Sequence, residues 1–236
     1  MSDSMHNAIA TIAALEDYLK RYPSGHFSEL AQAQLDALLA GRGEQRIEIV
    51  SSAANPFTQG TARANQDYRP GDVFEYQVID MLTRVIERTQ VHRVVRVLPR
   101  QVIFNGGRFV TDRLGNFLRT PNGATYGPNQ FYATEYAVGR KWTTRYSTVL
   151  PKGEDDEVEI DFKVTGRETV VVPAGRFDAY RVEGTGWLLG KSRSINVTYW
   201  IAPEQVPRAV LIERWQRQGK GIRKADRMEL MSYTRL

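Results

Sequence analysis

The spacing of hydrophobic residues divides the chain into a short helical part and a long β part. Ile9, Ile12, Leu15 and Leu19 recur every three or four residues, which places them on one face of a helix. Residues 22–25 read Tyr-Pro-Ser-Gly, and the proline ends this helix. A second helix of the same period follows, and glycines end it. Its apolar residues are Phe27, Leu30, Ala31, Leu35 and Leu38.

From residue 71 onward the period of the pattern changes to two. Val158, Ile160, Phe162 and Val164 alternate with charged residues, as in a half-buried strand. No helical pattern separates this strand from its neighbours, so the sheet should be antiparallel, and a run of about ten strands should curl or close. Further strands are expected near residues 73–82, 86–98, 101–104, 108–112, 141–149, 168–172, 176–188, 195–201, 208–217 and 227–230.

These patterns predict a mainly β chain, α+β overall, with three parts. Residues 1–43 form an N-terminal two-helix hairpin, residues 44–70 have no sustained period and form a linker, and residues 71–236 form an antiparallel β-barrel or strongly curved sheet of about ten strands. The apolar stripe of the hairpin is too large to leave in water, so we expect it to dock on the β domain or on a partner protein.

Two stretches of sequence resemble known families. Residues 14–27 and the following Leu30, Ala31 and Leu35 resemble the YLxxYPxGxF hairpin that is related to tetratricopeptide repeats, which implies protein contacts. Residues 172–183 and 199–203 are similar to the VPAGxFxAxxV and YWxAP words of a bacterial β-domain family of unknown function. That resemblance implies an exported, β-rich protein of the cell envelope. It also implies no catalytic residues.

The inventory of reactive side chains argues against several kinds of chemistry. The chain has no cysteine and three histidines, His6, His26 and His92, so thiol chemistry is excluded and a transition-metal site lacks ligands. His92 is the one histidine of the β domain, and no serine-elbow motif accompanies it. The acidic run at residues 154–157 lacks the glycine placement of a calcium loop. We predict no metal and no cofactor.

Two sets of residues are candidates for ligand binding. Large aromatic residues could line an apolar or glycan pocket, although filling of the core is the favoured interpretation of the same rings. The set is Tyr126, Phe131, Tyr132, Trp142, Trp187, Trp200 and Trp215. Residues 208–227 hold seven basic against two acidic residues, within a chain of net charge +5. The candidates for anion binding there are Arg214, Arg217, Arg223 and Arg227.

The first hypothesis for the whole chain is a non-enzymatic binding or scaffold module of the bacterial envelope. It would contact another protein or domain through the hairpin and bind an apolar or glycan ligand in or beside the barrel. One alternative is a hydrolase of glycans or cell wall that uses a carboxylate pair. A second is a basic module for nucleic acid or anionic lipid, but no RNA-binding motif supports nucleic acid.

The expected compartment is the periplasm or the envelope. The first residues lack the apolar core of a signal peptide, which leaves the cytoplasm as the alternative. No apolar run approaches the roughly 20 residues of a membrane-spanning helix, so no transmembrane segment is expected.

Overall fold

The computed structural model describes residues 60–153 and 155–235, together with ten residues of the N-terminal segment. It divides into two compact units, one holding the N-terminal segment and the other holding most of the chain from Ala62. In the first unit the ten described residues are helical, and Leu19, Ala31 and Leu35 are buried against one another. The predicted turn at residues 22–25 and most of the predicted linker lie outside the described residues.

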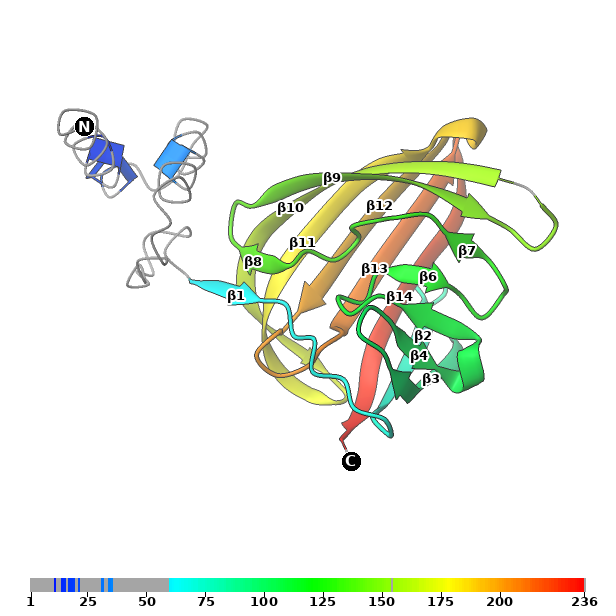
Figure 1. Ribbon diagram of the computed structural model, residues 1–236. Helices are drawn as coiled ribbons and strands as arrows, with labels where there is room; N and C mark the ends of the chain where they lie inside the picture. Colours follow the sequence, from blue (N-terminus) through cyan, green and yellow to red (C-terminus); the bar gives the residue numbers. More distant parts are fainter. Residues whose placement is uncertain are drawn as a thin grey trace. The chain divides into compact units, whose positions relative to one another are not determined.

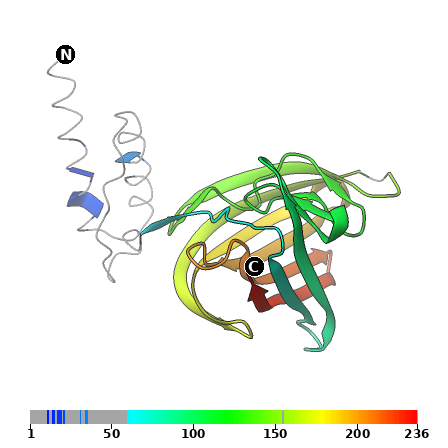
Figure 2. The same ribbon diagram turned by 60° about the horizontal axis from the view of Figure 1, so that its bottom comes forward.

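The second unit is a closed antiparallel barrel of twelve strands. Around the barrel the order is β10, β11, β12, β13, β14, β2, β3, β4, β5, β6, β7 and β9. Figures 1 and 2 show the long strands β10 to β14, coloured yellow to red, as a curved wall around the interior, with the short green strands on the other side. The bounds are β2 Val73–Asp80, β3 Ile86–Val97, β4 Val102–Phe104, β5 Phe109–Thr111, β6 Phe117–Arg119, β7 Thr125–Tyr126, β9 Lys141–Val149, β10 Asp155–Val172, β11 Gly175–Leu188, β12 Arg193–Ile201, β13 Ala209–Gln218 and β14 Gly221–Thr234.

Four short elements lie outside this order. Strands β1 (Thr61–Arg63) and β8 (Glu135–Ala137) form a separate two-stranded sheet. Single turns of 3₁₀ helix follow β4 (η2, Asn105–Gly107) and β11 (η3, Leu189–Lys191). No helix among the described residues is long and apolar enough to span a bilayer.

The barrel closes where its first strand in the sequence, β2, lies beside its last, β14. Strand β2 pairs with β14, with Val73 opposite Thr234 and Tyr76 opposite Leu230. Burial alternates along β2 because every second side chain faces the interior. The interior is filled mainly by rings, and the largest fully buried side chains include Tyr76, Tyr136, Tyr180, Tyr199, Phe74, Phe104 and Phe162.

The predicted mainly β architecture is confirmed, with more strands than the sequence indicated. Strand β10 runs unbroken for 18 residues where two strands were expected, because a shift of register between Val164 and Gly166 bends the ladder without ending it. Strands β6, β7 and β8 have two or three residues each and lie between residues 112 and 141, where no strand was expected. Strands this short are below the length at which alternation can be recognised.

Candidate anion site inside the barrel

Arg208 is a permanent charge inside the barrel. It directly precedes β13 and is 7% exposed. Its guanidinium carbon lies 5.7, 5.1 and 5.2 Å from the ring centroids of Phe74, Phe104 and Phe109. These distances place the cation near the outer limit of attraction to an aromatic face.

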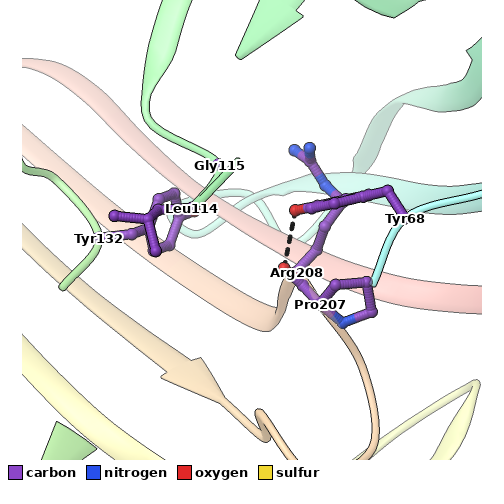
Figure 3. A pocket seen from close by; sticks show the side chains of 6 residues that line it. All are labelled: Tyr68, Leu114, Gly115, Tyr132, Pro207 and Arg208. Carbon is purple, nitrogen blue, oxygen red and sulfur yellow. Dashed lines mark hydrogen bonds between the residues drawn. The ribbon is translucent and has the colours of Figure 1, made fainter. Parts of the chain in front are cut away.

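Two tyrosines hold the backbone on both sides of Arg208. The Tyr68 hydroxyl donates to the carbonyl of Pro207 at 2.8 Å, and the Tyr76 hydroxyl donates to the carbonyl of Ala209 at 3.0 Å. Both bonds are buried, and Figure 3 shows the first of them. The guanidinium is therefore positioned by a rigid frame, as expected of a binding group rather than of a free surface side chain.

The charge of Arg208 has no counter-charge in the part of the chain that the structure describes. Nε and Nη1 are buried there without a hydrogen-bond partner, and no carboxylate lies within ion-pair distance. A guanidinium stays protonated in proteins, so it cannot avoid the cost of burial by losing its charge. A buried charge without a partner calls for an explanation, such as a functional role or a bound ion.

His92 packs beside this cation and is also buried. Its ring centroid lies 4.7 Å from that of Phe109 and 5.5 Å from that of Tyr76, and its Nδ1 has no described partner. Burial, assisted by the charge of Arg208, lowers the pKa of His92 to about 3. The imidazole is therefore neutral at physiological pH, and among the described residues it has no carboxylate to form a catalytic pair.

A narrow hollow opens beside Arg208. Its lining residues are Tyr68, Leu114, Gly115, Tyr132, Pro207 and Arg208, and Figure 3 shows Tyr132 and Leu114 facing Tyr68 and Pro207. It has no room for a water molecule unless a side chain moves. Burial raises the pKa of the Tyr132 phenol to about 12, so this group can donate a hydrogen bond at neutral pH.

A second group of charges lies further along the barrel. Arg214 donates to both oxygens of Asp226, at 2.9 and 2.7 Å, and Lys224 lies 3.4 Å from the same carboxylate. Burial, together with the charge of Arg214, lowers the pKa of Lys224. The charges of Arg208 and Arg214 both act to lower the pKa of Tyr132, against the larger effect of burial.

Asp80 and Asp226 are the carboxylates that the barrel brings opposite each other. They are partners in the register of β2 and β14. Hydrogen bonds from the backbone N–H groups of Thr83 and Leu82 lower the pKa of Asp80, while Asp226 is bound by Arg214. Asp80 thus has a lowered pKa and Asp226 lies in an ion pair, whereas a hydrolase needs one carboxyl group that keeps its proton. No cluster of three metal-ligating side chains occurs among the described residues.

The structure separates the predicted aromatic residues into an inner and an outer group. Phe131 and Tyr132 pack against Tyr199, at centroid distances of 5.6 and 5.1 Å, and Trp142 stacks on Phe162 at 5.2 Å. Tyr126 is half-buried against Tyr146 and Phe117. Of the inner group, Tyr132 is the one that lines the hollow.

The remaining three predicted aromatics lie on the outer face of the barrel. Trp187 is 52% exposed. Trp200 is covered, and its indole N–H donates to Glu168 at 2.6 Å. Trp215 is half-buried, with the Arg217 guanidinium 5.8 Å from its ring. These side chains do not share a pocket with Tyr132.

The predicted arginines also fall into two groups. Arg214 and Arg227 are neutralised, the latter by Glu213 at 2.6 Å and Glu229 at 2.5 Å. Arg217 and Arg223 are exposed and form no ion pair with a described residue. Sequence analysis missed the importance of Arg208 because its burial depends on rings from β2, β4 and β5, which no local pattern brings together.

Comparisons with known proteins do not assign a family. No family model matches the chain, and no curated protein matches it. A solved structure described as an exported protein with a YmcC-like fold, from Bacteroides fragilis, is 14% identical, with a TM-score of 0.49, over 74% of this chain and 100% of that one.

Two further solved structures are similar at a lower level. A protein described as a lipoprotein from Parabacteroides distasonis is 13% identical, with a TM-score of 0.44, over 70% of this chain and 96% of that one. The hypothetical lipoprotein YmcC from Escherichia coli is 12% identical, with a TM-score of 0.44, over 71% and 87%. At these values we base the function on the chain's own residues.

Proposed function

We propose that the chain is a non-catalytic binding module of the bacterial envelope, whose barrel holds a ligand through a carboxylate or phosphate group at Arg208. One observation carries the proposal: a rigidly positioned, buried guanidinium whose Nε and Nη1 have no described partner. The planar fork of arginine matches the two oxygens of such a group, and bonds to a charged acceptor are the strong ones.

The surroundings of Arg208 support a ligand of mixed character. The Tyr132 phenol can add a hydrogen bond, and the rings of Tyr68 and Tyr132 offer apolar faces. An acidic sugar or another small molecule with one acidic end combines these features. Because the hollow is narrow, the ligand enters only as the residues around Leu114 shift, so binding should be slower than diffusion allows.

The same surroundings favour binding over catalysis. His92 is neutral and without a described carboxylate partner, and Arg208 touches rings rather than a nucleophile. A group that works as a general base needs a pKa near the working pH, which burial prevents for His92. The envelope setting is supported by the resemblance of residues 172–183 and 199–203 to an exported β-domain family.

Calorimetry and thermal unfolding test this function with small acids. Acetate, phosphate and glucuronate represent the acidic groups, and glucose is the uncharged control for glucuronate. We expect at least one of the acids to raise the melting temperature by several degrees at about 100 times its dissociation constant, whereas glucose has no effect. Binding should disappear in Arg208→Met and persist in Arg217→Met, which removes an exposed cation. Absence of binding by all three acids would contradict the proposal.

The stability of Arg208→Met separates a binding role from a structural one. Methionine fills similar space without a charge, so the variant should be more stable than the wild type by about 1–2 kcal/mol in buffer free of small acids. The physical reason is that burial of two unpartnered N–H groups costs more free energy than the attraction between the cation and three distant rings contributes. Urea unfolding measures this difference. A loss of stability in Arg208→Met would mean that the cation holds the core together.

A further inference from the structure

Three hairpins end at the same side of the barrel. They are the turns that join β2 to β3, β11 to β12 and β13 to β14. Arg193, at the start of β12, is opposite both Leu188 of β11 and Gln218 of β13, so the β11–β12 and β13–β14 turns are neighbours. The β2–β3 turn lies beside β14, because the N–H of Met81 donates to the carbonyl of Ala225 at 2.9 Å. We call these three turns and the residues that flank them, 81–88, 187–193 and 217–224, the tip surface.

The tip surface concentrates exposed apolar side chains. Among the described residues eleven large hydrophobic side chains are exposed, and six of them belong to this surface. The six are Leu82 at 58%, Val85 at 60%, Ile86 at 57%, Trp187 at 52%, Leu189 at 41% and Ile222 at 41%. Exposed apolar residues scattered singly need no explanation, but a group gathered at adjacent turns indicates a contact surface.

The same three segments are strongly basic. They contain eight basic residues, Arg84, Arg88, Lys191, Arg193, Arg217, Lys220, Arg223 and Lys224, against one acidic residue, Glu87. The turn between β9 and β10 lies at the same end and is acidic, and its neighbour Asp156 pairs with Lys191 at 2.8 Å, so the basic excess lies mainly on the β2–β3 and β13–β14 turns. Lys220 and Arg223 are exposed and form no ion pair with a described residue. The partner of this surface must therefore carry negative charge and also offer an apolar phase.

We propose that the tip surface docks on a lipid bilayer that contains anionic lipids. The basic residues would contact the headgroups, while Leu82, Val85 and Ile86 would enter the boundary between headgroups and acyl chains. Trp187 lies at the edge of the surface, and the interface between water and membrane is where tryptophan is enriched. Nucleic acid fits less well, because its phosphate backbone offers no apolar phase to the tip side chains. The inference does not depend on a ligand at Arg208.

Sedimentation with vesicles tests the docking of the full chain. The vesicles are phosphatidylcholine with about 30 mol% phosphatidylglycerol, compared with pure phosphatidylcholine at about 0.1 M NaCl. We expect binding to the anionic vesicles only. The double variant K220A/R223A should lower the partition coefficient roughly 20-fold, since each cation near an anionic surface contributes about a fivefold factor. The variant L82S/I86S should lower it at least fivefold.

Matched variants at the opposite end of the barrel are the controls. R100A/R176A removes two exposed cations, and V95S/V171S removes two apolar side chains that are 50% and 63% exposed. Both should bind vesicles like the wild type. Brominated lipid should quench the fluorescence of Trp187, so the quenching should be lost in Trp187→Phe and kept in Trp142→Phe, whose side chain lies inside the barrel.

Three results would overturn the inference. The first is no partition into anionic vesicles by a folded wild-type chain. The second is an equal loss of vesicle binding in the tip variants and in their opposite-end controls, which would indicate that the vesicles attract the net charge of the chain alone. The third is tight binding of duplex DNA together with no binding of vesicles.

Discussion

Arg208 and His92 show how the interior of the barrel treats ionisable residues. Arg208 keeps its charge among three phenylalanine rings, while His92 loses its charge at neutral pH because it is buried and lies near that cation. Each group is held in one ionisation state. Nε and Nη1 of Arg208 and Nδ1 of His92 have no described partner, although the Arg208 guanidinium also interacts with the Tyr76 hydroxyl. The two side chains therefore reduce stability in different ways, one at all pH values and one only in acid.

The lowered pKa of His92 predicts a loss of stability in acid. In the unfolded chain histidine titrates near 6.5, so between pH 6.5 and about 3 the unfolded state binds a proton that the folded state refuses. The stability that depends on a neutral His92 is fully present above pH 6.5 and is lost as the pH falls. Between pH 7 and pH 4 the wild type should lose about 3 kcal/mol more than His92→Phe, as measured by urea unfolding. Parallel pH profiles for the two proteins would contradict the lowered pKa.

At the scale of the element, strand β11 depends on two glycines that face strand β10. A Cβ atom added at Gly184 would lie 2.4 Å from the Phe162 ring, and one added at Gly186 would lie 2.0 Å from the carbonyl oxygen of Glu159. Neither position has room for any side chain, because the Phe162 ring and the backbone of β10 lie directly against β11 here.

Alanine substitutions should separate this close approach from a general effect of glycine. Gly186→Ala should lower the free energy of unfolding by about 3 kcal/mol or more, because the added methyl group meets backbone that cannot move aside. Gly166→Ala is the matched control in β10, where no atom lies within 4 Å of the added methyl. It should be neutral or slightly stabilising. Equal effects at the two positions would show that the close approach is relieved by movement of β10.

Sequence analysis predicted the elements of this fold better than the site. Alternation of two residues identified the long strands, such as residues 157–164 within β10, because one face of each is buried. The site at Arg208 was not predictable, because it joins residues of β2, β4 and β5 with the residue before β13, and the sequence does not show which strands become neighbours across a closed barrel.

At the scale of the whole molecule, the pairing of β2 with β14, which we call the seam, joins distant parts of the chain. Strands β10 to β14 follow one another as hairpins, so each pairing is local in sequence. The pairing of β2 with β14 instead brings Tyr76 opposite Leu230. Contacts so far apart in sequence carry a large cost of loop closure, and we expect them to form late in folding.

Two buried substitutions test the order of folding. Leu230 is 0% and Ile160 is 2% exposed, so alanine at either position should cost about 2–4 kcal/mol. Leu230→Ala should act mainly by raising the unfolding rate, since the seam forms after the transition state. Ile160→Ala, within the local pair of β10 and β11, should mainly slow folding. Stopped-flow kinetics in urea measure both rates. The reverse pattern would mean that the seam forms first.

The same seam determines how the barrel responds to a pulling force. Val73, where β2 begins, is opposite Thr234, where β14 ends, so both strand ends lie at one side of the barrel. A force that separates these ends acts along the ladder's hydrogen bonds and loads them one at a time, as in opening a zip. Strands pulled from opposite ends would instead share the load across the whole ladder. The pairing of β2 with β14 is therefore weak against a force that pulls Val73 and Thr234 apart.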